Sequence, residues 1–116
     1  MYDFEKVNKN NAEHYAWGTN CDGWRLVKSD ELSIIQERVP PGASEVKHYH
    51  KKAWQFFFIL SGEAIIEIGT KTYILRKHEG IEVPPKLPHK LTNNSSIDLV
   101  FIVTSKPKSH GDRVLI

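Results

Sequence analysis

The chain has 116 residues, of which 40% are hydrophobic and 26% are charged. This length suits one domain with a real apolar core, and the composition is that of an ordinary globular protein. The 16 basic and 14 acidic residues are interspersed and leave a formal charge of +2. A concentrated basic patch for nucleic acid is therefore not expected.

Membrane insertion and export are also not indicated. The longest uninterrupted apolar run, Phe56 to Leu60, is too short to cross a membrane. The first twenty residues lack the apolar core of a signal peptide, so we expect a cytoplasmic protein. The single cysteine, Cys21, excludes an internal disulfide and a cluster of thiolate metal ligands.

Short runs of β-forming residues, separated by turn residues, follow one another from Trp24 onward. The segment before them, Tyr2 to His14, has weak periodicity and is interpreted as a loose arm or a short helix. Strands are predicted for residues 32–37, 45–50, 54–60, 63–68, 71–75, 81–83, 89–92 and 97–104. Short strands at this even spacing predict an all-β antiparallel sandwich or barrel.

We predict a single domain in three parts. Residues 1–30 form an arm and a first strand, residues 31–104 form the barrel, and residues 105–116 form a polar tail that packs along its outside. Two overlapping Asn-x-Ser sequences begin at Asn93 and Asn94, and we interpret them as turn chemistry.

Two histidines, His48 and His50, stand one residue apart in a predicted strand. Alternate side chains of a strand share a face, so these imidazoles point the same way. If Gln55 lies on the next strand, it faces the same interior, and His89 could join the set from a returning strand. Imidazole suits divalent first-row metals. A His-x-His pair is common by chance, so the metal interpretation depends on the surrounding pattern.

That pattern resembles the first motif of the cupin superfamily. Gly42 precedes the His48-x-His50 pair, Gln55 occupies the place of a glutamate, and Gly62 closes the turn. The segment from Pro84 to Asn93, "PPKLPHKLTN", resembles the second motif, in which a proline-rich turn leads to a histidine and then to an asparagine. The match covers roughly Glu31 to Thr104.

The resemblance implies a small double-stranded β-helix, the cupin jelly-roll barrel. It also implies one bound divalent transition metal, which could be Fe, Mn, Ni, Zn or Co. The ligands implied are His48, His50, Gln55 and His89. The alternative is a barrel without metal, whose histidines bind a ligand directly.

Three positions depart from the motifs. His78 stands at the leading glycine of the second motif, with Gly80 two residues further on, and Lys86 stands at its inner glycine. Gln55 replaces the common glutamate. Three neutral imidazoles and an amide would leave the charge of the ion uncompensated, which favours an anionic or chelating ligand.

Alternation along the strand from Trp54 to Leu60 predicts an apolar outer face. The inward side chains would be Gln55, Phe57 and Ile59, and the outward ones would be Trp54, Phe56, Phe58 and Leu60. We expect a second subunit or the arm to cover the outward set. Cupins commonly dimerise through this side, and we expect a homodimer.

The segment Trp17–Trp24 would either fold over the mouth of the barrel or pack on the sheet. Arg113 would reach a ligand carboxylate or pair with Asp112 or another surface acid. One of Glu37 and Arg38 faces the cavity, and alternation alone does not say which.

The function that this resemblance favours is a metal-dependent enzyme acting on a small anionic or sugar-acid metabolite. Its chemistry would be that of a Lewis-acid isomerase or lyase, or of an Fe(II) dioxygenase. Titratable groups eligible for proton transfer are Glu37, Tyr49 and Tyr73. The alternative is a cupin that binds or senses a small molecule without catalysis, because fold does not determine function.

Overall fold

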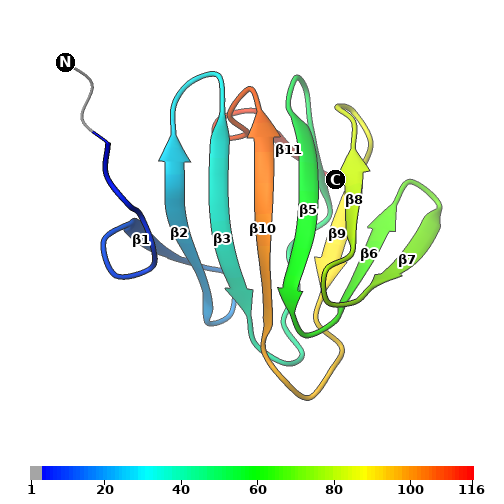
Figure 1. Ribbon diagram of the computed structural model, residues 1–116. Helices are drawn as coiled ribbons and strands as arrows, with labels where there is room; N and C mark the ends of the chain where they lie inside the picture. The colour runs from blue at the N-terminus through cyan, green and yellow to red at the C-terminus, as the bar shows by residue number, and fades with distance from the viewer. Residues whose placement is uncertain (1–3) are drawn as a thin grey trace.

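A computed structural model of the chain describes residues 4–116, which form two antiparallel sheets packed into a jelly-roll barrel (Figure 1). In spatial order the six-stranded sheet contains β1 (Glu13–Trp17), β2 (Cys21–Lys28), β3 (Ser33–Val39), β10 (Leu99–Lys106), β5 (Trp54–Ser61) and β8 (Gly80–Val83). The five-stranded sheet contains β11 (Arg113–Leu115), β4 (His48–His50), β9 (His89–Thr92), β6 (Ala64–Ile68) and β7 (Lys71–Leu75). The predicted all-β barrel is confirmed.

None of the residues from 4 to 116 belongs to a helix long and apolar enough to span a membrane.

Period-two alternation sets which side chains enter the barrel. The inward side chains of β10 lie opposite those of β5. The opposed pairs are Phe101 with Ile59, Val103 with Phe57, and Ser105 with Gln55. All six side chains are buried. These pairs change from apolar to polar along the strands, so one end of the barrel interior is apolar and the other is polar.

The apolar end holds the hydrophobic core. Its fully buried side chains include Ile59, Ile66, Leu91, Leu99 and Phe101, which come from both sheets. On β3 the same division appears between Val39, which is completely buried in the core, and Glu37, which lines a cavity at the polar end. The apolar end therefore supplies the packing that supports the polar end.

The N-terminal region differs from the prediction, because it contributes two strands rather than one. The hairpin of β1 and β2 extends the six-stranded sheet at its edge (Figure 1). Only Tyr15 and Trp17 of β1 are partly buried, so the apolar alternation that would reveal this strand is weak. Residues 4–12 form no helix or strand, and Tyr2 lies outside the described residues.

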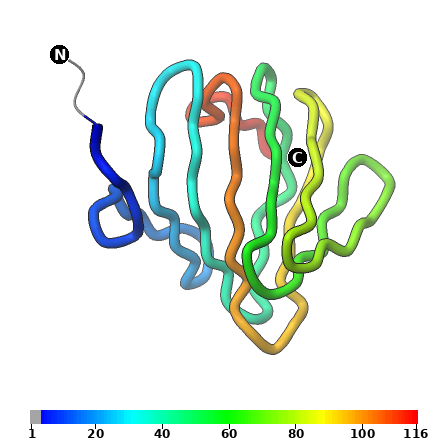
Figure 2. The backbone as a smooth tube through the Cα atoms, in the orientation of Figure 1, coloured from blue at the N-terminus to red at the C-terminus, as the bar shows by residue number. Residues whose placement is uncertain are grey.

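The prediction that the tail lies outside the barrel is wrong. Figure 2 shows the chain turning back after β10 toward the other sheet. There β11 pairs with β4, with Arg113 opposite His50 and Leu115 opposite His48. The tail is polar because it borders the polar end of the interior, where an apolar sequence is not required.

Asn93 organises the turn before β10. It is completely buried, and its amide group donates hydrogen bonds to the carbonyl oxygens of Val39 and Ile97, each at 2.8 Å. Its side-chain oxygen accepts from the backbone N–H and the hydroxyl of Ser95. The interpretation of this segment as turn chemistry is confirmed.

We expect Asn93→Ala to lower the free energy of unfolding by about 2 to 4 kcal/mol, because it removes a side-chain donor from the buried carbonyl of Val39 and dismantles the hydrogen bonds that order the turn through Ser95 and Ile97. Denaturant titration measures this loss. The matched control is Asn94→Ala, since Asn94 is exposed, and it should change stability by less than about 0.5 kcal/mol. Equal effects of the two substitutions would contradict this role of Asn93.

Candidate metal centre

Pairing of β4 with β9 brings three histidines together. His48 and His50 share the inward face of β4, and His89 lies opposite His48 in the register. Ring centroids are 4.9 Å apart for His48 and His50 and 4.4 Å apart for His48 and His89. One ligand nitrogen from each ring can be chosen so that all three lie within 4.8 Å of one another. This group could hold a metal ion.

Backbone carbonyls determine which nitrogen of two rings carries the proton. Nδ1 of His48 lies 2.7 Å from the oxygen of Val46, and Nδ1 of His89 lies 3.0 Å from the oxygen of Leu87. A carbonyl oxygen can only accept, so Nδ1 is the donor in both rings. Nε2 of each ring therefore keeps its lone pair, which is the state a metal ligand needs.

Burial keeps these imidazoles uncharged. All three side chains are buried, and burial lowers the pKa of His48 to about 3 and that of His50 to about 4. The pKa of His89 is also lowered, chiefly by burial. The centre therefore offers neutral nitrogen donors at neutral pH.

Polar atoms at this centre lack partners within residues 4–116. Nε2 of His89, Nδ1 of His50 and Oε1 of Gln55 are buried and accept or donate no hydrogen bond. Leaving such atoms unpaired costs about 1 to 3 kcal/mol each. A cation bound among nitrogen and amide oxygen donors would satisfy such atoms, so the residues present fit a divalent metal ion.

Gln55 faces the same interior as the histidines. Its amide nitrogen donates to the hydroxyl of Ser105 at 3.2 Å, and this orients the side chain. Its oxygen is the unpaired atom. Its role as a fourth ligand stays a prediction.

The two departures in the second motif keep a glycine-like backbone. His78 and Lys86, which stand at the positions of its glycines, have φ angles of 65° and 72°. These values lie in the left-handed region that favours glycine. The N–H of Lys86 donates to the carbonyl of His50 at 2.7 Å. The turn that delivers His89 is thus preserved although the glycines are replaced.

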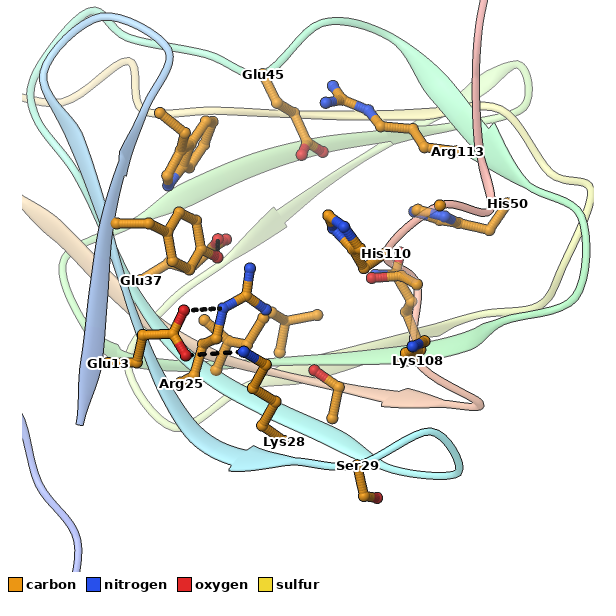
Figure 3. A pocket seen from close by; sticks show the side chains of 18 of the residues that line it. Glu13, Arg25, Lys28, Ser29, Glu37, Glu45, His50, Lys108, His110 and Arg113 are labelled. Carbon is orange, nitrogen blue, oxygen red and sulfur yellow. Dashed lines mark hydrogen bonds and ion pairs between the residues drawn. The ribbon is translucent and has the colours of Figure 1, made fainter.

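A cavity of about 770 Å³ opens at the polar end of the barrel, with His48, His50 and Gln55 in its lining. Figure 3 shows Glu37, Arg25, Glu13 and Lys28 on one side of the cavity and Arg113 and His50 on the opposite side. Of the groups proposed for proton transfer, Glu37 lines the cavity, whereas Tyr49 and Tyr73 do not.

Glu37, not Arg38, faces the cavity. The hydroxyl of Tyr15 donates to Oε2 of Glu37 at 2.8 Å. Arg38 lies on the other face of β3, where it pairs with Asp22 and Asp98. Burial raises the pKa of Glu37 to about 7, although Tyr15 and the cations Arg113 and Arg25 act in the opposite direction. Burial and the charge of Glu37 raise the pKa of Glu45 to about 8.

Arg113 lines the cavity beside the histidine strand. Its Nη2 donates weakly to the carbonyl of Val46 at 3.4 Å, and it forms no ion pair with residues 4–116. The predicted alternative, an ion pair with Asp112, is wrong. The carboxylate of Asp112 instead accepts the backbone N–H groups of Lys51, Lys52 and Ala53.

Sequence reasoning missed several lining residues. Tyr15 and Arg25 come from the N-terminal hairpin, and Lys108 and His110 come from the tail. The segment Trp17–Trp24 satisfies both of its proposed roles in part. Trp17 lines the cavity, whereas Trp24 lies against His14 and Lys9. Tyr15, Arg25 and Lys108 stand in no alternating pattern that would mark them as lining residues. The polar composition of the tail is the signal in the sequence that could have pointed to Lys108 and His110.

Comparison with known proteins agrees with this architecture. The model of the cupin domain matches residues 35–105, and the chain belongs to this family. An uncharacterised protein of Methanocaldococcus jannaschii is 27% identical over 92 residues, which cover 78% of this chain and 74% of that protein.

Solved structures show the same fold. KdgF from a Halomonas species superposes with a TM-score of 0.83 at 13% identity, covering 93% of this chain and 97% of that one. A sugar phosphate isomerase of the cupin superfamily from Silicibacter pomeroyi superposes with a TM-score of 0.78 at 17% identity, and the match covers 90% of this chain and 76% of that one.

We expect Glu37→Gln to raise the free energy of unfolding of metal-free protein at pH 8 by about 1 to 3 kcal/mol, because one pKa unit corresponds to about 1.4 kcal/mol. The pKa of Glu37 in the folded chain lies above its ordinary value of 4.5. The folded state therefore binds the proton of Glu37 more tightly than the unfolded state does. The free energy of unfolding of the wild type falls as the pH rises from about 4.5 to about 7. The difference between the two proteins should be small at pH 4.5 and full above pH 7.

Denaturant titration at pH 4.5 and pH 8 measures this difference. Glu82→Gln is the control, because Glu82 is an exposed carboxylate on β8. A stability difference for Glu37→Gln that does not change with pH would contradict the raised pKa.

Proposed function

We propose that this cupin is a metal-dependent enzyme that acts on a small anionic metabolite, with sugar acids included in that class. The observation that carries the proposal is the convergence of three uncharged histidines, two of which, His48 and His50, line a cavity that also contains the unpaired guanidinium of Arg113. Neither the histidines nor Gln55 contributes negative charge. A cation bound among them would keep its attraction for an anion.

The centre would be held by His48, His50 and His89, with Gln55 as the proposed fourth ligand. A bound divalent ion would polarise a carbonyl or carboxylate oxygen of the ligand, and iron(II) would add dioxygen chemistry. Arg113 would bind the carboxylate of the ligand through its fork of donors.

Glu37 is the residue we propose for proton transfer. Its Oε2 is held by Tyr15, and its Oε1 has no hydrogen-bond partner among residues 4–116. A carboxyl with a pKa of about 7 holds and releases a proton near neutral pH, which suits a general acid or base. The groups that face it are Tyr15, Arg25, Arg113 and Glu45.

The homodimer also stays a prediction. Trp54 and Phe56 on the outer face of β5 are 49% and 43% exposed, as expected for side chains that a second copy would cover. Phe58 stacks between Phe56 and His78 and is only partly exposed.

Untagged protein should carry close to one divalent transition metal ion per chain, and elemental analysis measures this content. His48→Ala or His89→Ala should remove most of the metal, because each deletes one of the converging donors. His14→Ala is the control, since His14 pairs with Asp22 outside the cavity. Metal retained at full stoichiometry in the His48→Ala, His50→Ala double variant would refute the assignment.

Gln55→Glu should tighten metal binding and weaken an anionic ligand such as oxalate by roughly 1 to 3 kcal/mol, because a carboxylate lowers the net charge of the centre. Isothermal titration of metal and then of oxalate measures both effects. Gln36→Glu, on the outer face of β3, is the matched control. Equal metal affinity of wild type, Gln55→Glu and Gln55→Ala would show that Gln55 is not a ligand.

A further inference from the structure

The cavity has two chemically different ends. One end contains His48, His50 and Arg113, with His89 behind them in the metal-type group. The positive charge of Arg113 has no acidic partner within 4 Å among the described residues. The register of β11 on β4 places Arg113 directly beside His50. This end suits one anionic group, because its donors are the neutral imidazoles and the cationic Arg113, with the carboxyl of Glu45 near Arg113 in the lining (Figure 3).

The opposite side is built by β1, β2 and β3, and Trp17 and Ile35 line it beside polar residues. These polar residues, called the polar wall, are Glu13, Tyr15, Arg25, Lys28, Ser33 and Glu37. Two carboxylates and two cations cancel when ionised. Oxygens of Glu13 lie 2.9 Å from Nζ of Lys28 and 3.6 Å from Nε of Arg25. The guanidinium of Arg25 lies over the ring of Tyr15 at 4.6 Å.

The polar wall therefore presents hydrogen-bonding groups with little net charge, which is zero when Glu37 is ionised and +1 when Glu37 is protonated. A second anionic group finds no free cation there, because Lys28 and Arg25 are already paired with Glu13. An apolar tail would cover Oε1 of Glu37, which has no hydrogen-bond partner among residues 4–116, without giving it one, which is unfavourable. Hydroxyl groups can donate to Glu37 and accept from Tyr15 or Arg25.

From this arrangement we propose that the ligand is a polyhydroxylated monocarboxylate, whose carboxylate binds at the histidines and Arg113 and whose distal hydroxyls bind the polar wall. This inference rests on the proposed function, because it assumes an anion at the metal centre. A cavity of about 770 Å³ has room for a chain of several carbons beyond the carboxylate. Tyr15 and Glu37 are then the specificity-determining residues of the far end.

A matched pair of ligands isolates the far end. D-Gluconate and 2-hydroxyhexanoate have the same carboxylate and the same hydroxyl on carbon 2, so both engage the metal end alike. They differ only in the hydroxyls on carbons 3 to 6. Isothermal titration with metal-loaded protein should show gluconate binding at least about tenfold more tightly, as expected for one or two additional hydrogen bonds in a partly dry site.

Substitutions in the polar wall should remove this preference. Tyr15→Phe should weaken gluconate about fivefold or more and change 2-hydroxyhexanoate less than twofold. Glu37→Gln also removes a charge that acts on both anions alike, so its readout is the ratio of the two affinities, which should fall about fivefold or more. Tyr73→Phe and Glu82→Gln, which lie outside the cavity, are the matched controls and should leave both affinities unchanged.

Oxalate separates the two levels of the proposal. If oxalate fails to bind the metal-loaded protein, the anion-binding function is wrong and this inference fails with it. If oxalate and 2-hydroxyhexanoate bind but gluconate is not preferred, the function stands and the polyhydroxylated ligand is refuted. A preference for gluconate that survives in both Tyr15→Phe and Glu37→Gln overturns the assignment of the polar wall.

Discussion

The opposition of His48 and His89 across β4 and β9 is the constraint on which the rest of the site depends. Strand β4 has only three residues, and it is held between β9 and β11. A shift of its register by one residue would turn both of its histidines out of the barrel. Because the rings are buried and neutral, the chain keeps three metal-type donors together without charge repulsion.

This arrangement has a cost that the rest of the barrel offsets. Unpaired polar atoms of His50, His89 and Gln55 destabilise the protein until a ligand reaches them. The same strands that present these atoms continue into the apolar end, where Ile59 and Phe101 are fully buried. The same alternation therefore builds a stable core at one end of the barrel and a polar cavity at the other. Metal binding would add to the stability of the fold.

The tail and the N-terminal hairpin close the cavity from two sides. Asp112 accepts three backbone N–H groups from residues 51–53, and Lys108 pairs with Asp30 at 2.8 Å. These contacts link the end of the chain to the histidine strand and to the turn between β2 and β3. Residues far from the motifs therefore determine the shape and the charge of the space in front of the histidines.

Local patterns of the sequence determined the β class of the chain, the shared face of His48 and His50, and the inward direction of Gln55. Each depends only on the period of two along a strand, which is written into neighbouring residues. The spacing of the two motifs determined the likeness to cupins and the place of His89. The replacement of the motif's glycines by His78 and Lys86 did not move His89 from this place, because both residues adopt the left-handed backbone conformation that glycine would.

The tertiary structure decided everything that depends on pairing between distant strands. Whether Glu37 or Arg38 enters the cavity follows from the register of β3 with β2 and β10. Arg113 reaches the histidines only because β11 pairs with β4, more than sixty residues earlier in the chain. Tyr15 meets Glu37 for a similar reason. A polar cavity wall leaves no apolar period in the sequence, so these residues look like ordinary surface until the sheets are assembled.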